Sequence, residues 1–200
     1  MSAARDLMIV AMDVAPGRHV AQGDLSLALA GAELVDLLRA EAVTLDGDRV
    51  VPGATPSLDD PLLERAAAGL VRDEPYEPVE DWLWRRGRGL AQEYLTVLEA
   101  EGLLVRPRGS WLPFRSARPV PAESPARQRA AHRWAADEPV LTTLAAVAGV
   151  RGEVPEDVPP PEGAAQTVCA AVADAVAELE AVRRRRAIEN AAFSNVWRGA

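Results

Sequence analysis

The chain has 200 residues, 48% of them apolar and 26% charged, which is typical of a soluble folded domain with a sizeable core. Its formal net charge is −8. Because the phosphates of nucleic acids attract basic surfaces, this balance argues against a general nucleic-acid-binding protein. The sequence contains no run of about 18 apolar residues, so we expect no membrane-spanning helix.

The residue types also indicate the compartment. The one cysteine, Cys169, cannot form an intramolecular disulfide, which favours a reducing environment. No signal peptide is recognisable, because the apolar stretch at residues 7–12 is short and is followed by Asp13. All 22 basic residues are arginine, which with the many Ala, Pro and Gly residues is typical of a GC-rich bacterial genome. We therefore expect a cytoplasmic bacterial protein whose membrane contact, if any, is peripheral.

The first quarter of the chain predicts a short buried segment, then a helix, then a hairpin. Residues 5–13 are apolar and short, as in a buried strand or a helical turn, and a loop follows to Gly23. From Asp24, which is a suitable N-cap, apolar residues recur at helical spacing. Residues 43–51 form two β-branched runs around Asp46-Gly47, which predicts a β-hairpin with a type I′ turn.

The middle of the chain predicts three helices. A capping box from Ser57 to Asp60 predicts the start of the first. Residues 79–84 predict a short helix, and two glycines at 87 and 89 predict a break before a long helix that reaches residue 101 and ends at Gly102.

The remainder predicts a second hairpin followed by helices. Residues 103–106 and 110–114 alternate as the arms of a hairpin do, and helices are expected at residues 124–136, 139–150 and 164–196, with a proline-rich loop at 152–163. The predicted fold is mainly α: one globular helical domain spanning residues 1–200, with two β-hairpins.

Three arginines surround the predicted break between the two middle helices. Arg85, Arg86 and Arg88 lie beside a helix start, where guanidinium groups and free N–H groups can hold an anion. The alternative is a surface cluster that pairs with neighbouring carboxylates such as Asp81 or Glu80.

The second hairpin interleaves aromatic, apolar and basic residues. Trp111, Leu112 and Phe114 lie between Arg106 and Arg108 on one side and Arg115 on the other, which suits either an anionic membrane interface or a contact with a second copy of the chain. A hairpin packed on its own core is the third alternative. A helix followed by a hairpin also resembles a DNA-binding winged helix, but Glu93 and Glu99 stand where a recognition helix carries basic residues.

Signatures of catalysis and of metal binding are absent from the sequence. His19 and His132 are isolated, and the chain contains neither a phosphate-binding GxxxxGK loop nor a GxSxG nucleophile motif. The four arginines at 183–186 point around a predicted helix in different directions, which favours a solvated face. We predict no catalytic residue, no metal and no cofactor.

Four segments together resemble one known family. They are LSLALAGAELVDLLRAEAVTL at residues 25–45, TPSLDDPLLERA at 55–66, DWLWRRGRGLAQEYLTVLEAEGLLV at 81–105 and LPFRSARPVP at 112–121. In this order and approximate spacing, the chain resembles the Golgi phosphoprotein 3 family, whose domain also occurs in bacteria, notably actinomycetes. The resemblance covers essentially the whole chain.

The resemblance implies a mostly helical, non-enzymatic domain that binds the headgroup of phosphatidylinositol 4-phosphate at the cytosolic face of a membrane. In eukaryotes such proteins also bind the cytosolic tails of Golgi glycosyltransferases, and the hairpin after the long helix is implicated in self-association and membrane contact. The lipid pocket of the family uses a tryptophan and three arginines. Ungapped alignment places the first two near Ala21 and Ala30 and the second two at Arg88 and Ala91, so that Arg88 alone matches.

The function expected from the sequence is non-catalytic, peripheral binding of a phosphoinositide-like anionic phospholipid at the inner membrane face. Arg88 is expected to contact phosphate, with Arg85 and Arg86 beside it, while Trp111 and Phe114 touch lipid or a neighbouring subunit. The alternative is a protein–protein interaction adaptor that has kept the fold and lost the lipid site.

Overall fold

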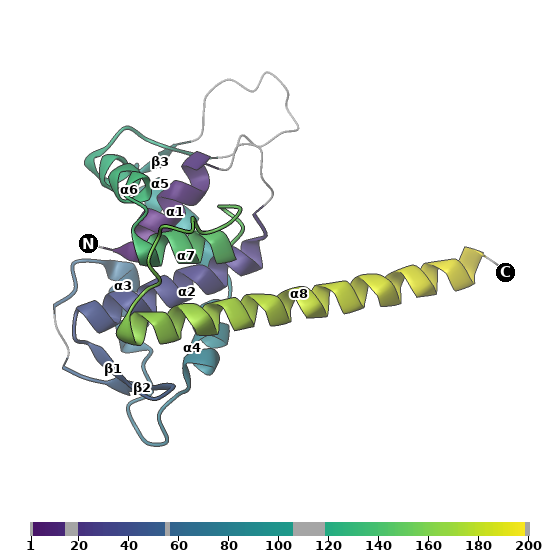
Figure 1. The fold of residues 1–200 in the computed structure, drawn as a ribbon, viewed down its shortest axis with the longest axis horizontal. Coiled ribbons are helices and arrows are strands. Elements are labelled where there is room, and N and C mark those ends of the chain that lie inside the picture. Colours follow the sequence, from purple (N-terminus) through teal and green to yellow (C-terminus); the bar gives the residue numbers. More distant parts are fainter. Residues whose placement is uncertain (1, 15–19, 55–56, 106–118, 199–200) are drawn as a thin grey trace.

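The computed structural model describes residues 2–14, 20–54, 57–105 and 119–198, and only the backbone of the last eight of these. Within this part of the chain lie eight helices and two antiparallel sheets of two short strands each, so the mainly α prediction is confirmed (Figure 1). The helices are α1 (Ala3–Val14), α2 (Gln22–Arg39), α3 (Pro61–Ala68), α4 (Val79–Arg86), α5 (Leu90–Ala100), α6 (Pro125–Ala135), α7 (Pro139–Val147) and α8 (Gly163–Arg198). The strands are β1 (Val43–Asp46), β2 (Arg49–Pro52), β3 (Leu104–Val105) and β4 (Val120–Pro121).

The first apolar segment is a helix and not a strand. In α1 nearly every side chain is buried, so its sequence shows no polar face from which a helical period could be recognised. The buried carboxylate of Asp36 accepts hydrogen bonds from the N–H groups of Ala3 and Ala4 at 2.9 and 3.3 Å. A residue from α2 therefore caps α1, which the local sequence could not reveal.

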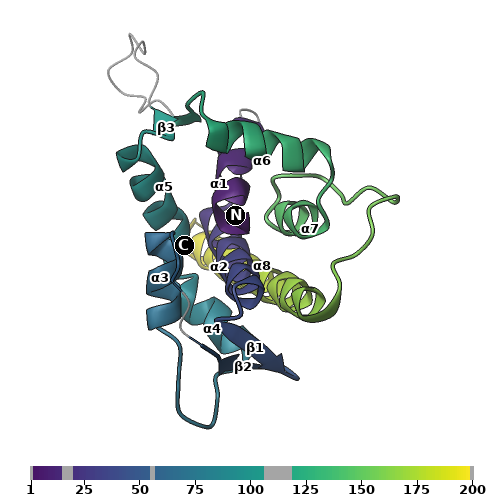
Figure 2. The ribbon, with the colours of Figure 1, turned by 90° about the vertical axis from the view of Figure 1, so that its left-hand side faces the viewer.

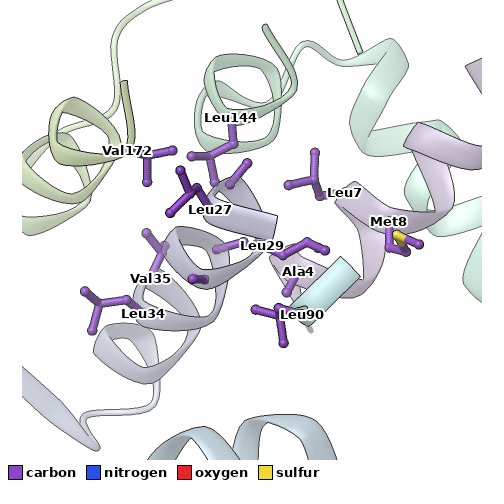
Figure 3. Close-up of a cluster of buried hydrophobic side chains, with 14 of the residues drawn as sticks. Ala4, Leu7, Met8, Leu27, Leu29, Leu34, Val35, Leu90, Leu144 and Val172 are labelled. Atoms are coloured by element: carbon purple, nitrogen blue, oxygen red, sulfur yellow. The ribbon is translucent and has the colours of Figure 1, made fainter. Parts of the chain in front are cut away.

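The centre of the fold is α2, in which every residue from Asp24 to Leu37 is buried. The prediction that Asp24 caps this helix is wrong, because the helix begins at Gln22 after Ala21, which makes no side-chain cap. Figure 2 shows α2 and α8 side by side, with α3 and α5 on one side and α6 and α7 on the other. Side chains of α1, α2, α5, α7 and α8 meet in the core, as Figure 3 shows for Leu7, Leu29, Leu90, Leu144 and Val172.

Glycine allows α8 to approach α2 closely. A methyl group on Gly31 would lie only 2.4 Å from Cγ2 of Val172, and one on Gly23 would lie 2.9 Å from Cδ2 of Leu179. At these two glycines, side chains of α8 therefore pack directly on the backbone of α2. α8 also contacts α4 and α7.

The first predicted hairpin is confirmed, with a different turn. Asp46 pairs with Arg49, so the two turn residues are Gly47 and Asp48, one position later than predicted. Gly47 has a positive φ of 59° and Asp48 does not, whereas a type I′ turn needs positive φ at both. Glycine at the first central position is the pattern of a type II′ turn instead.

The start of α3 also differs from its prediction. Asp60, not Ser57, is the N-cap, since its Oδ1 accepts from the N–H of Leu62 at 3.0 Å. Pro61 occupies the first helical position, where its missing N–H costs nothing. The same carboxylate pairs with Arg5 of α1 at 2.7 Å, so Asp60 joins α3 to α1.

The middle helices follow the sequence closely. α4 ends at Gly87, α5 begins after Gly89, and Gly102 with a φ of 72° ends α5. β3 then pairs with β4, so that Leu104 opposes Pro121 and Val105 opposes Val120. The predicted second arm of this hairpin, residues 110–114, lies outside the described residues.

The last helix is the longest element. α8 has 36 residues; its first half packs on the body of the protein, and its second half continues beyond the other helices (Figure 1). Val172 and Val176 are buried, whereas every residue from Arg184 to Asn190 is exposed.

Candidate functional site

A pocket of about 520 Å³ opens where the start of α2, the turn between α4 and α5, and α8 meet. Its lining combines three large apolar side chains with one cation and two amides. The lining residues are Gln22, Gly23, Ser26, Leu27, Trp84, Gly87, Arg88, Gly89, Gln92 and Leu179.

Two glycines shape the turn that forms one wall of this pocket. A methyl group at Gly87 would lie 2.6 Å from the carbonyl oxygen of Leu83 in the last turn of α4, so this position favours glycine strongly. The same group would also lie 3.3 Å from Cδ2 of Leu27, a tight contact with α2. Gly89 has left-handed backbone angles, φ 71° and ψ 9°, which reverse the chain into α5. Arg88 lies between the two glycines, at the tip of the turn.

Arg88 is a cation without a protein partner in the described part of the chain. Its side chain is exposed and makes no ion pair or hydrogen bond there, although carboxylates hold many other arginines of this acidic protein. The backbone N–H groups of Arg88 and Gly89 likewise have no acceptor among the described residues. The guanidinium is therefore available to a ligand at the edge of the pocket, next to two backbone N–H groups that make no hydrogen bond to the described residues.

The first N–H groups of α5 are not available, which corrects the expectation that the helix start itself offers free donors. The N–H of Ala91 donates to Oγ of Ser26 at 3.1 Å. The N–H groups of Gln92 and Glu93 both donate to the carbonyl of Gly89, at 3.0 and 3.1 Å. The free donors lie earlier, in the turn.

Arg86 does not line the pocket but pairs with a buried carboxylate. Its Nε and Nη2 donate to the two oxygens of Glu33 at 2.7 and 2.9 Å, and its Nη1 lies 3.1 Å from Glu93. Tyr94 donates its hydroxyl to Glu33 at 3.0 Å. Burial raises the pKa of Glu33 to about 7, against the opposing effect of these hydrogen bonds. The geometry thus gives Arg86 a structural role, and its predicted contact with a headgroup has no support here.

Arg85 is also held by a carboxylate. Its Nε and Nη2 donate to the two oxygens of Glu77 at 2.7 and 2.6 Å, and its guanidinium lies 5.2 Å from the centre of the Trp82 ring. Both arginines therefore pair with carboxylates, as the alternative expected, but their partners are Glu77 and Glu33 and not Asp81 or Glu80, and Arg86 is no surface pair. Arg88 is the arginine of this cluster that lines a pocket.

Of the four positions matched to the lipid site of the resembling family, only Arg88 lines this pocket. Ala21 lines a separate pocket with Arg183 and Arg184. Ala30 is buried, and its carbonyl accepts from Nε1 of Trp82 at 3.4 Å. Ala91 is buried against Ser26, and Ala21 precedes the pocket residue Gln22. Three small neutral side chains thus stand at these positions, and Arg88 supplies the charge.

Several lining residues could not be found by sequence reasoning. Trp84 and Gln92 flank the turn and carry no motif of their own, and Leu179 joins the pocket from a helix about 90 residues further along the chain. The amphipathic pattern marks Leu179 only as a core residue.

The hairpin residues Trp111, Leu112 and Phe114 lie outside the described residues, so their predicted contact with lipid or a second subunit stays a prediction. The arginine run of α8 is largely solvated, as predicted: residues 184–186 are exposed, whereas Arg183 pairs with Asp24 at 2.6 Å.

The described residues contain no group of three or more His, Cys, Asp or Glu side chains that could hold a metal ion. In the same part of the chain, no helix combines the length and the apolar character that crossing a membrane requires.

The comparison with protein families agrees with the resemblance carried by the four sequence segments. No curated protein matches the chain significantly. The model of the family described as Golgi phosphoprotein 3 (GPP34) matches residues 3–191, nearly the whole chain. The chain therefore belongs to the Golgi phosphoprotein 3 family.

Proposed function

We propose that this protein binds the phosphorylated headgroup of an anionic phospholipid, of the phosphatidylinositol 4-phosphate class, without catalysing a reaction. The pocket beside Arg88 is the proposed site, and the cytoplasmic face of a membrane is the proposed location. The observation that carries the proposal is Arg88 itself, an unpaired guanidinium within the described residues that lines a pocket.

Phosphate is the ligand group that fits these donors best. A guanidinium binds phosphate through two parallel hydrogen bonds, and neighbouring backbone N–H groups in a turn with a left-handed residue form a concavity for anions. Arg88 offers the guanidinium, and the turn at Gly89 offers the backbone N–H groups.

The rest of the pocket fits a polyol that carries the phosphate. Its volume of about 520 Å³ lies in the range of small-molecule sites. Leu27, Trp84 and Leu179 present apolar surface to the edge of a sugar-like ring, while Gln22 and Gln92 bring amides that can bond hydroxyl groups.

Family membership supports the proposal through Arg88, which is the one aligned position that keeps the arginine of the family and lines the pocket. The loss of three of the four side chains lowers the expected affinity, since each missing cation removes charge-assisted hydrogen bonds.

One observation favours the second candidate, a protein-interaction adaptor. The pocket has a single cation among mostly apolar walls, which also suits an apolar peptide residue next to a carboxylate. A peptide would need no phosphate, and this is the property that separates the two candidates.

Co-sedimentation with vesicles tests the proposal. Phosphatidylcholine vesicles with and without phosphatidylinositol 4-phosphate are compared for the unaltered protein, Arg88→Ala and Arg85→Ala, with the water-soluble headgroup as competitor. Binding that needs the phosphorylated lipid, that the headgroup competes away and that Arg88→Ala weakens supports the proposal. Arg85→Ala is the matched control, because Arg85 is exposed but pairs with Glu77. Equal binding to both vesicle types would reject lipid recognition and favour the adaptor.

A further inference from the structure

One face of α8 leads from the core, past the pocket, into solvent. Val172, Leu179 and Arg186 are spaced seven residues apart, so each lies only about 20° around the helix axis from the one before it. Val172 is fully buried against Gly31 of α2, and Leu179 lines the Arg88 pocket. Arg186 is the next residue on this face, and it is exposed.

Arg186 lies on the pocket side of α8 but beyond the end of α2. α2 begins at Gln22, which already lines the pocket beside Leu179. Seven residues of helix place the backbone of Arg186 about 10 Å further along the axis. The second half of α8 projects past the other helices in Figure 1, and the side chain of Arg186 is exposed.

The charge of Arg186 has no partner among the described residues, unlike that of its neighbour on the same face. Arg183 lies about 40° from Leu179 around the axis, and it pairs with Asp24 at 2.6 Å. That ion pair joins α8 to the start of α2 at the pocket. Arg186 makes no ion pair within the described part of the chain.

We propose that Arg186 contacts the headgroup of a second anionic lipid, next to the one whose headgroup occupies the Arg88 pocket. This inference rests on the proposed lipid-binding function and deepens it, because it sets the side of α8 that faces the bilayer. The partner is the anionic surface of a membrane, which presents further negative headgroups beside the bound one.

A bilayer fits this arrangement better than a soluble ligand does. One headgroup that fills the pocket at Leu179 lies about two turns of helix before Arg186. A membrane supplies negative charge over a plane, so a cation on the same face but further along the rod still meets it. The inference therefore predicts that binding depends on the general anionic lipid as well as on the lipid in the pocket.

Arg184 provides a matched control on the same helix. It is also exposed and carries the same charge, but it lies about 140° from Leu179 around the axis, where it lines a separate pocket beside Gly149 and Glu180. Substitution of either arginine by alanine removes one charge from the exposed half of a helix, so the two variants have the same net charge and comparable helix stability.

The experiment measures partition of the unaltered protein, Arg186→Ala, Arg184→Ala and Arg88→Ala onto phosphatidylcholine vesicles that carry phosphatidylinositol 4-phosphate, with and without added phosphatidylserine. Phosphatidylserine should strengthen binding of the unaltered protein. Arg186→Ala should weaken binding to the phosphatidylserine vesicles about fivefold, the effect of one arginine near an anionic surface, and Arg184→Ala much less.

Each outcome decides one point. Equal losses in Arg186→Ala and Arg184→Ala, or no loss in either, would overturn the inference, because charge alone would then explain binding without a preferred side of α8. If Arg88→Ala meanwhile abolishes binding, the proposed function stands without it. If neither the phosphorylated lipid nor Arg88 matters for binding, the proposed function fails, and this inference fails with it.

Discussion

Arg86 and Glu33 form a bidentate ion pair at the junction of α2, α4 and α5. The two nitrogen–oxygen distances are 2.7 and 2.9 Å, and the Glu33 side chain is completely buried. Tyr94 donates a further hydrogen bond to the same carboxylate, and its ring is itself buried. The pair holds together the helices that form the walls of the Arg88 pocket.

Arg86→Ala should destabilise the fold strongly, because it leaves the buried carboxylate of Glu33 without its cation. Removal of one partner of a buried pair costs about 3–5 kcal/mol of unfolding free energy. Arg85→Ala breaks a pair whose arginine is 42% exposed and should cost about 1 kcal/mol or less. Urea unfolding of both variants measures the difference, and equal losses would contradict the structural role given to Arg86.

Glu33 should make stability depend on pH. Burial raises its pKa from 4.5 to about 7, so between these values the folded state binds more protons than the unfolded state. Its contribution is therefore fully present below pH of about 4.5 and is lost as pH rises through about 7. The unfolding free energy of the unaltered protein relative to Glu33→Gln should fall over this window. A difference that stays constant with pH would show that Glu33 does not titrate there.

Gly31→Ala should destabilise the contact between α2 and α8. The added methyl group would lie 2.4 Å from Val172 Cγ2, and overpacking of this kind costs about 1–3 kcal/mol, partly offset by the gain in helix propensity of about 1 kcal/mol. Combination with Val172→Ala makes room for the methyl group, so the double variant should lose less than the sum of the two single losses. Strict additivity in urea unfolding would contradict the close approach.

Cys169 should be unreactive in the folded protein. It is buried in α8, and burial raises the pKa of its thiol to about 12, so almost no thiolate exists at neutral pH. Labelling by a thiol reagent should be slow in buffer and complete in urea, with a rate that follows the unfolding equilibrium. Rapid labelling without denaturant would show that the first half of α8 separates from the body.

The helices were predictable where their sequences carry local signals. Ser124 and Gly102 mark a helix start and a helix end, and the structure confirms both. The sequence of α1 is ambiguous because its neighbours cover it on nearly all sides. Asp24 has the residue type of a cap but pairs with Arg183 of α8, and α3 begins at the local cap Asp60, three residues after Ser57. A capping residue type therefore marks the neighbourhood of a helix start and does not by itself fix the residue that caps it.

The candidate site was predictable only in part. The sequence drew attention to three arginines within four residues, but it could not separate Arg88 from the two that meet Glu33 and Glu77. Those carboxylates lie 53 and 8 positions away from their partners. The folded arrangement of α2 and α4, which sequence spacing does not encode, decides which charge stays available to a ligand.

Titration with the water-soluble headgroup of phosphatidylinositol 4-phosphate, followed by amide chemical shifts, tests directly whether Arg88 binds the phosphate. On the ¹⁵N-labelled protein, we expect saturable shifts that are largest at Arg88, Gly89 and Gln92. These residues line the pocket, and the N–H groups of the first two make no hydrogen bond to the described residues. Arg88→Ala should abolish them while leaving the other resonances in place. Saturable shifts centred elsewhere, or shifts at the turn that survive Arg88→Ala, would contradict the assignment of Arg88 as the phosphate-binding residue.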